Sequence, residues 1–340
     1  MIQPDGKTAS QVKACCARLG KDPLLVQGAG GNVSWKEGDV LWVKASGTWL
    51  ARAEQEEIFI PVDLAHVRQE IAAGNFSITP VVLGDSTLRP SIETLMHALM
   101  PQPIVVHLHV VEILANLVRE RCDISAAALP EAVLPLAVVD YFKPGAELAK
   151  EIHAALAKQP TARVLFLKNH GVVIGVENTG QVEPLLTALI EAMKIAPVAV
   201  SPTADSPAKS QHSELVPVAD NEIHQLACNP TLFNRLSTDW ALYPDHVVFL
   251  GPKPFIFDSW QALNDYTRSA PVPELVFIRD AGVFVSASFS EAKHLQLRCY
   301  LDVMVRQDVD QQLSSLSGDK IAELLNWDAE QYRMSLSVKS

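Results

Sequence analysis

Short apolar runs rich in β-branched residues alternate along this chain with longer stretches in which apolar residues recur at helical spacing. The short runs predict strands at residues 40–44, 104–107, 164–167, 247–250 and 275–278. The longer stretches predict helices at residues 10–19, 91–100, 111–119, 146–158, 182–194 and 290–305. Because alternating strands and helices pack as layers, the pattern predicts an α/β fold.

The composition is that of a globular protein that needs no cross-links. With 340 residues, 48% of them apolar, the chain can bury the core of one large or two modest domains. The five cysteines form no CxxC pair and no framework of the secreted kind. The sequence shows neither a leader peptide nor a run of about 18 apolar residues, so we expect a cytoplasmic protein without a membrane partner.

The net charge limits the partners. The chain carries 28 basic and 39 acidic residues, a formal charge of −11, which disfavours binding to nucleic acid. An anionic small molecule remains an acceptable substrate, because donors aimed into a cleft outweigh a diffuse field that is screened beyond about 10 Å.

A segment rich in Pro, Ser, Thr and Ala at residues 196–211 has no apolar period and predicts a linker. We therefore expect a first domain at residues 1–200, a linker at 201–212 and a C-terminal lobe at 213–340.

The C-terminal lobe contains an echo of the first domain. LVFIRDAGVFVSA at 275–287 aligns with VLFLKNHGVVIGV at 164–176, and VVFLG at 247–251 aligns with VVHLH at 105–109. The alignment places Phe249, Gly251 and Ala281 where the first domain has histidines. We interpret the lobe as a degenerate repeat that kept the packing and lost the metal ligands.

Two histidines stand at the end of an apolar strand. His107 and His109 are two residues apart, so their side chains point to the same face of the strand. The pair alone fits a solvent-facing strand end as well as a metal site. His170 follows another predicted strand and precedes Gly171, and three histidines at neighbouring strand ends match the open, three-ligand site of catalytic zinc.

Glu93 is the carboxylate that we expect near this metal site. It lies in the first turn of the helix predicted at 91–100, where a carboxylate could equally serve only the helix dipole. His97 lies four residues later on the same helix face, and we expect it to support or pack against the site rather than to bind the ion.

Two glycine-containing loops precede or follow the first strands. GAGGNVS at 28–34 and KASGT at 44–48 are either simple turns or loops whose backbone N–H groups converge on an anion. GAGGN lacks the spacing of a dinucleotide-binding loop, and no serine occurs in a GxSxG motif. These absences disfavour a Rossmann site and a serine hydrolase.

Taken together, GGNVS, KASGT, PSIETLMH, VVHLH and FLKNHGVVIGV resemble the class II aldolase/adducin family over about residues 10–195. The whole chain resembles the aldolase portion of bifunctional rhamnulose-phosphate aldolase/dehydrogenase proteins, and the first domain resembles fuculose- and rhamnulose-phosphate aldolases. The resemblance implies a three-layer α/β/α sandwich of the class II aldolase type, with an additional smaller α/β C-terminal lobe. It also implies a homo-oligomer, a tetramer in relatives.

The resemblance assigns roles by position. It implies a lyase that cleaves or forms a carbon–carbon bond of a ketose or ketose phosphate through an enediolate on a divalent ion, expected to be Zn²⁺. His107, His109 and His170 would bind the ion, and Glu93 would act as acid/base and as a fourth ligand before substrate binds. The residues implied for the substrate's phosphate are Gly31, Asn32, Ser46, Gly47 and Ser91.

The sequence departs from the family pattern at two places. Ile92 stands where sugar-phosphate members often have a second hydroxyl residue, and the tyrosine proton donor of fuculose-type aldolases has no counterpart. The same metal site would also suit a sugar-phosphate epimerase, a dehydratase or a decarboxylase. A non-catalytic adducin-like module and a protein with a structural metal are the alternatives from other classes.

Overall fold

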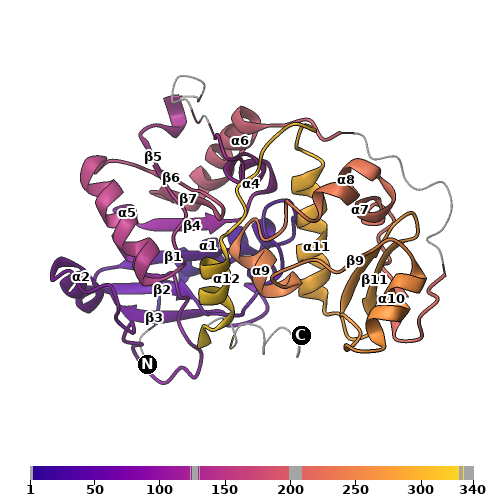
Figure 1. Ribbon diagram of the computed structural model, residues 1–340. Helices are drawn as coiled ribbons and strands as arrows, with labels where there is room; N and C mark the ends of the chain where they lie inside the picture. Colours follow the sequence, from indigo (N-terminus) through magenta and orange to yellow (C-terminus); the bar gives the residue numbers. More distant parts are fainter. Residues whose placement is uncertain are drawn as a thin grey trace.

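The computed structural model describes residues 3–122, 124, 129, 131–198, 209–328 and 332. Figure 1 shows two lobes side by side, the first around a seven-stranded sheet and the second around a four-stranded sheet. Most of the predicted linker, at residues 201–208, lies outside the described residues.

The sheet of the N-terminal lobe has the strand order β3-β2-β1-β4-β7-β6-β5. Its strands are β1 (Asn32–Glu37), β2 (Val40–Lys44), β3 (Phe59–Asp63), β4 (Ile104–Leu108), β5 (Leu136–Val139), β6 (Val164–Leu167) and β7 (Gly171–Val176). Only β5 and β6 pair in parallel, and the other neighbours are antiparallel. All five residues of the central strand β4 are buried, as expected for a strand covered on both faces.

Helices cover both faces of this sheet. One layer consists of α1 (Gly6–Gly20), α4 (Val111–Leu117) and α6 (Val182–Met193), and the opposite layer of α2 (Leu64–Ala72), α3 (Thr94–Leu99) and α5 (Ala146–Lys158). Along β4, Val106 and Leu108 pack into the first layer, whereas Val105 packs into the second. This alternation confirms the predicted three-layer α/β/α sandwich.

The C-terminal lobe has the strand order β8-β11-β10-β9. Its strands are β8 (Leu215–Pro217), β9 (Ile256–Phe257), β10 (Leu275–Ile278) and β11 (Gly282–Ser286). Its helices are α7 (Gln225–Cys228), α8 (Pro230–Arg235), α9 (Pro244–Leu250), α10 (Trp260–Thr267), α11 (Glu291–Met304) and α12 (Gly318–Leu325). The lobe is therefore α/β, as predicted.

The lobes share helix α4. Ile113 and Leu117 of this helix pack into the core of the N-terminal lobe, while Leu114 and Val118 pack into the core of the C-terminal lobe. A helix with apolar residues on two faces is buried between two layers, so each lobe completes the burial of the other.

Four of the five predicted strands are present, but the strand predicted at 247–250 is wrong. These residues belong to α9, which begins with Pro244 and ends before Gly251, whose φ is 91°. Proline favours the first position of a helix and glycine the position after its end, whereas a four-residue apolar run alone does not separate a strand from a buried helix. The predicted match of VVFLG with VVHLH therefore has no structural counterpart.

The other predicted match, between residues 164–176 and residues 275–287, does have a structural counterpart. The hairpins β6–β7 and β10–β11 pair in the same register, with Leu167 opposite Gly171 and Ile278 opposite Gly282. Asn169 and Asp280 occupy the same place in the two turns and both have positive φ, 53° and 56°. An origin of the lobe by duplication stays a prediction.

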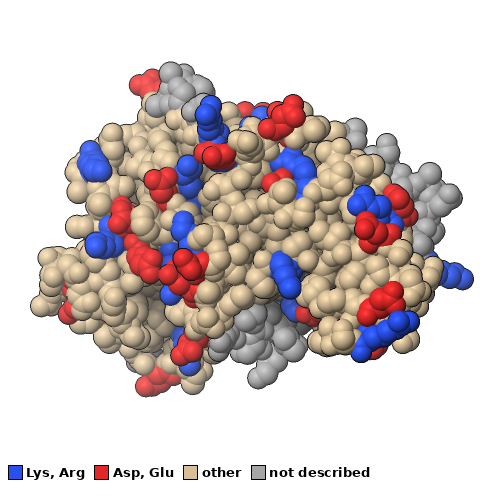
Figure 2. All heavy atoms as spheres, viewed as in Figure 1, with Lys and Arg blue, Asp and Glu red and all other residues tan. Residues whose placement is uncertain are grey.

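The described surface is mixed in charge on the face shown in Figure 2. In Figure 2, Lys and Arg side chains are interspersed with Asp and Glu side chains, so the visible described surface presents no broad field of one sign. None of the described helices combines the length and apolarity that a membrane span requires.

Arg306 forms a buried ion pair across the lobes. Its Nε and Nη2 donate to the two carboxylate oxygens of Glu112 on α4, at 2.9 and 2.7 Å. The side chains of Arg306 and Glu112 are 7% and 13% exposed. We expect Arg306→Met to lower the free energy of unfolding by about 3–5 kcal/mol, because it leaves the Glu112 carboxylate buried without its cation.

Urea unfolding followed by circular dichroism measures this loss. Arg268→Met is the matched control, since Arg268 pairs with Asp265 at the surface with side chains 75% and 50% exposed, and it should cost less than about 1 kcal/mol. A loss equally small for Arg306→Met would refute a stabilising role for the interlobe pair.

Candidate metal centre

Two neighbouring strands bring the three predicted histidines to one edge of the sheet. His107 lies in β4, His109 follows β4, and His170 precedes β7. Because β4 and β7 are antiparallel, with His107 opposite Val173, the end of one strand lies beside the start of the other.

Gly171 makes this convergence sterically possible. A Cβ atom at this position would lie 2.5 Å from the carbonyl oxygen of Leu108. It would also lie 3.2 Å from a ring carbon of His109 and 3.3 Å from a ring carbon of His107. No real Cβ tolerates the first of these distances. The glycine thus leaves the space that the imidazoles fill.

The three imidazoles form a compact, buried group. One ring nitrogen of each lies within 4.8 Å of those of the other two, and Nε2 of His107 is 3.1 Å from Nε2 of His109. Residues His107, His109 and His170 are 0%, 6% and 5% exposed. Within the described part of the chain, these side chains could hold a metal ion together.

Contacts on the far side of two rings indicate which nitrogen faces the centre. Nδ1 of His107 lies 3.0 Å from the carbonyl oxygen of Val172, and Nδ1 of His109 lies 3.2 Å from Oδ2 of Asp245. Carbonyl and carboxylate oxygens accept hydrogen bonds, so a hydrogen on each Nδ1 would suit both contacts and would leave each Nε2 with a lone pair directed inward. In these tautomers two lone pairs would face each other across 3.1 Å, and a cation between the rings would relieve their repulsion.

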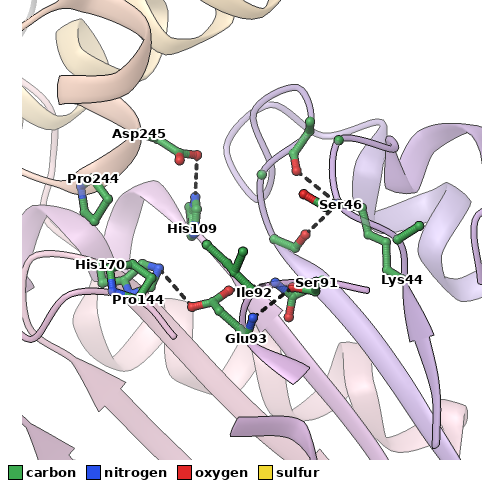
Figure 3. A pocket seen from close by; sticks show the side chains of 16 residues that line it. Lys44, Ser46, Ser91, Ile92, Glu93, His109, Pro144, His170, Pro244 and Asp245 are labelled. Atoms are coloured by element: carbon green, nitrogen blue, oxygen red, sulfur yellow. Dashed lines mark hydrogen bonds and ion pairs between the residues drawn. The ribbon is translucent and has the colours of Figure 1, made fainter. Parts of the chain in front are cut away.

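Glu93 lies beside this group and leaves one oxygen without a hydrogen bond (Figure 3). Its Oε2 lies 3.5 Å from Nε2 of His107 and accepts a 2.7 Å hydrogen bond from the amide of Asn32, while its Oε1 lies 3.4 Å from Nε2 of His170. Oε1 is buried and has no hydrogen-bond partner in the described structure. An unsatisfied carboxylate oxygen beside imidazole nitrogens is a further donor for a cation.

Glu93 was predicted in the first turn of a helix, but it lies just before the helix begins. Helix α3 begins at Thr94, and Glu93 precedes it without capping it through its side chain. The backbone turns here because the N–H of Glu93 donates to Oγ of Ser91 and the N–H of Thr94 to the carbonyl of Ser91. The carboxylate is thereby turned away from the helix axis and toward the imidazoles.

Burial sets the charges at neutral pH. It lowers the pKa of His107 to about 4 and that of His170 to about 3, against the opposing effect of the Glu93 carboxylate. For Glu93 itself burial raises the pKa, but the neighbouring imidazoles and the Asn32 amide outweigh it and hold the pKa at about 2. Neutral imidazoles and an ionised carboxylate are the protonation states that metal binding requires.

The residues predicted to bind phosphate line the same cavity as Glu93, His109 and His170. They are Gly31, Asn32, Ser46, Gly47 and Ser91. The backbone N–H groups of Ser46 and Ser91 already donate to the carbonyls of Arg89 and Lys44, at 2.9 and 3.2 Å. These two residues therefore offer the cavity their hydroxyl groups rather than their amides.

Asn32 also contacts two buried side chains beside the cavity. Its amide nitrogen is bound to Glu93, and its amide oxygen contacts Nε2 of His97, whose Nδ1 contacts Oγ of Ser34 at 2.7 Å. His97 is fully buried behind Asn32 and outside the metal group, as predicted for a supporting residue. Asn32 therefore orients Glu93.

Lys44 holds the glycine loop in place. Its Nζ donates to the carbonyls of Ala29 and Gly31, at 2.9 and 3.0 Å. The loop needs glycine at 31 in two respects, because φ there is 62° and a Cβ would lie 2.9 Å from the carbonyl oxygen of His107. The loop is thus fixed against the strand that carries the first histidine.

Asp245 is a site residue that sequence reasoning missed. It comes from α9 in the C-terminal lobe, is 2% exposed, and lines the cavity together with Pro244. No motif marks a single aspartate so far along the chain from the histidines. Pro244, the residue before it, favours the start of a helix. The apolar run at 247–250 was instead interpreted as a strand, so the helix was not predicted.

Comparisons with known proteins bear on the first lobe. One curated protein that matches is an uncharacterized oxidoreductase, YuxG of Bacillus subtilis (strain 168), 28% identical over 173 residues that make up 46% of this chain and 24% of that protein. The chain therefore matches about a quarter of the length of this relative.

Several solved structures are similar to the first lobe. The N-terminal class II aldolase domain of a conserved protein from Thermoplasma acidophilum is 23% identical, with a TM-score of 0.45 over 57% of this chain and 95% of that one. YgbL from Klebsiella pneumoniae, a putative aldolase/epimerase/decarboxylase, is 19% identical, with a TM-score of 0.45 over 56% and 89%. An L-fuculose 1-phosphate aldolase is 18% identical, with a TM-score of 0.43 over 56% and 84%.

A sequence profile gives the family. The profile of the Class II Aldolase and Adducin N-terminal domain matches residues 10–196, which is more than half of the 340-residue chain. The matched range contains the three histidines, Glu93 and both glycine loops. The chain belongs to the class II aldolase and adducin family.

Proposed function

We propose that this chain is a divalent-metal-dependent aldolase that cleaves or forms a carbon–carbon bond beside the carbonyl of a ketose or ketose phosphate. The observation that carries the proposal is the buried convergence of His107, His109 and His170 beside the unsatisfied Oε1 of Glu93. Membership of the family supports it.

The donor set fits a metal ion such as zinc. Imidazole nitrogen suits zinc and other late first-row ions, and three histidines leave a coordination place open for a ligand. Glu93 would be a fourth donor before substrate binds. When bound, the ion would supply Lewis-acid stabilisation of negative charge on oxygens beside the substrate carbonyl, worth several kcal/mol.

Glu93 would move the proton. Its Oε2 is held by Asn32, while its Oε1 is free of hydrogen bonds, so Oε1 is the atom available to take a proton from the substrate and to return it. A positioned carboxylate of this kind contributes roughly 10²–10⁴-fold to the rate. Asn32 keeps the carboxylate from turning away.

The rest of the cavity would hold the far end of the substrate. Ser91 accepts a hydrogen bond from the N–H of Glu93, which leaves its hydroxyl hydrogen available to a substrate oxygen or phosphate. Gly31, Ser46 and Gly47 line the same cavity, and Ile92 adds an apolar side chain to its lining. Sugars with and without a phosphate are therefore both candidates, rhamnulose phosphate among them.

Product analysis separates the reactions open to this site. Incubation with a panel of ketoses and ketose phosphates should release an aldehyde if the chain is an aldolase. Formation of an epimer, loss of water or release of CO₂ instead would assign the site to an epimerase, a dehydratase or a decarboxylase.

Assembly as a homo-oligomer, a tetramer by resemblance, stays a prediction.

We expect the protein purified without chelators to contain about one divalent ion per chain and to lose it, together with turnover, on dialysis against EDTA. Because both lobes have large apolar cores made of other residues, the far-UV circular dichroism at 25 °C should not change. Elemental analysis and added Zn²⁺ complete the test. Unfolding on chelation would show a structural metal, and protein without metal would favour the adducin-like module.

We expect Glu93→Gln to keep the bound ion and to lower turnover by about 10²–10⁴-fold, because an amide cannot accept the proton while the three histidines remain. Steady-state kinetics and metal analysis on the same sample measure both effects. Glu57→Gln is the control, since the side chain of Glu57 is 84% exposed, and it should behave as wild type. Turnover of Glu93→Gln within tenfold of wild type would disprove the acid/base role.

A further inference from the structure

Asp245 reaches the metal centre from the other lobe. It stands in the first turn of α9, and Pro244 and Asp245 are the residues of the described C-terminal lobe that line the cavity. A carboxylate that is 2% exposed has lost nearly all contact with water, which costs several kcal/mol unless hydrogen bonds replace that contact.

The contacts of Asp245 lead to one histidine. Its Oδ2 lies 3.2 Å from Nδ1 of His109 and accepts a 3.2 Å hydrogen bond from Nε2 of Gln296 on α11. The glycine loop closes over this pair, since a Cβ on Gly30 would lie 3.1 Å from both Oδ2 of Asp245 and Nδ1 of His109. Figure 3 shows the carboxylate pointing at the ring of His109 from the opposite lobe.

The three histidines differ in what holds them. His107 is held by the carbonyl of Val172, which belongs to the neighbouring strand of the same sheet. Nδ1 of His170 is buried and has no hydrogen-bond partner in the described structure. His109 is the ligand that is held by a side chain of the C-terminal lobe.

We propose that Asp245 is a positioning residue: it holds His109 as the Nδ1–H tautomer and aims its Nε2 at the shared metal ion. The inference rests on the proposed metal centre. Metal-bound histidines commonly donate their second N–H to a carboxylate, which fixes the ring and raises the basicity of the ligand nitrogen. Gln296 fixes the carboxylate in turn, so the C-terminal lobe is part of the metal centre.

The consequence is a graded loss of metal affinity. Asp245→Ala removes the acceptor and should weaken metal binding by about 10–100-fold, the range found for such supporting residues. Asp245→Asn keeps an oxygen that can accept the N–H of His109 and should lose less. Asp302→Asn is the control, because Asp302 is a buried carboxylate of the same lobe that pairs with Arg298, away from the cavity.

Competition with a chromophoric chelator measures the affinity for Zn²⁺, and Co²⁺ substitution reports the ligand geometry through its visible absorption bands. We expect altered Co²⁺ bands for Asp245→Ala, nearly native bands for Asp245→Asn, and native affinity and bands for Asp302→Asn. Neither readout needs turnover.

The outcomes separate the two proposals. Wild-type protein that binds neither ion would overturn the metal centre and this inference with it. Wild-type protein that binds metal, with Asp245→Ala unchanged in affinity and spectrum, would overturn only the role of Asp245. If Asp245→Asn bound metal normally but lost turnover, the carboxylate would act on the substrate rather than on His109, which also contradicts the inference.

Discussion

The antiparallel pairing of β4 with β7 is the constraint on which the whole site depends. It places the last residues of one buried strand beside the first residue of the next, and so carries three imidazoles to one point. The pairing tolerates no side chain at residue 171, where a Cβ would lie 2.5 Å from the carbonyl of Leu108. Sheet register and one glycine thus set the geometry of the centre.

Burial then decides the chemistry that this geometry can support. It keeps the pKa values of His107 and His170 far below neutral, while their rings and Asn32 keep Glu93 ionised. A buried, ionised carboxylate with an unsatisfied oxygen is costly without a cation. The proposed ion offsets that cost, and the same arrangement supplies the Lewis acid and the proton carrier of the proposed reaction.

Much of this was predictable from the sequence, for local reasons. The pattern His-x-His at a strand end puts two rings on one face, and β4, β6 and the helices around them follow from apolar periodicity. Glu93 was found because it stands near the histidines along the chain. Its rotation toward them was not predictable, since it depends on the hydrogen bonds of Ser91 and on Asn32.

What the sequence could not reveal depends on contacts between distant segments. The contacts of the Asn32 amide with Glu93 and His97 join segments that lie far apart in the sequence. Asp245 lies behind an apolar run that predicts a strand and forms a helix, and only the packing of α9 and α11 on the first lobe brings it to His109. Local sequence pattern predicts the three histidines and Glu93, whereas tertiary packing decides which residues hold them in place.

The central claim is that one divalent ion sits between the three imidazoles. Anomalous X-ray diffraction at the zinc edge, on crystals of protein purified without chelators, tests it most directly. We predict a single strong peak about 2.0–2.1 Å from a nitrogen of each of His107, His109 and His170. A zinc-loaded crystal with no peak there, or with the three rings too far apart to share an ion, would contradict it.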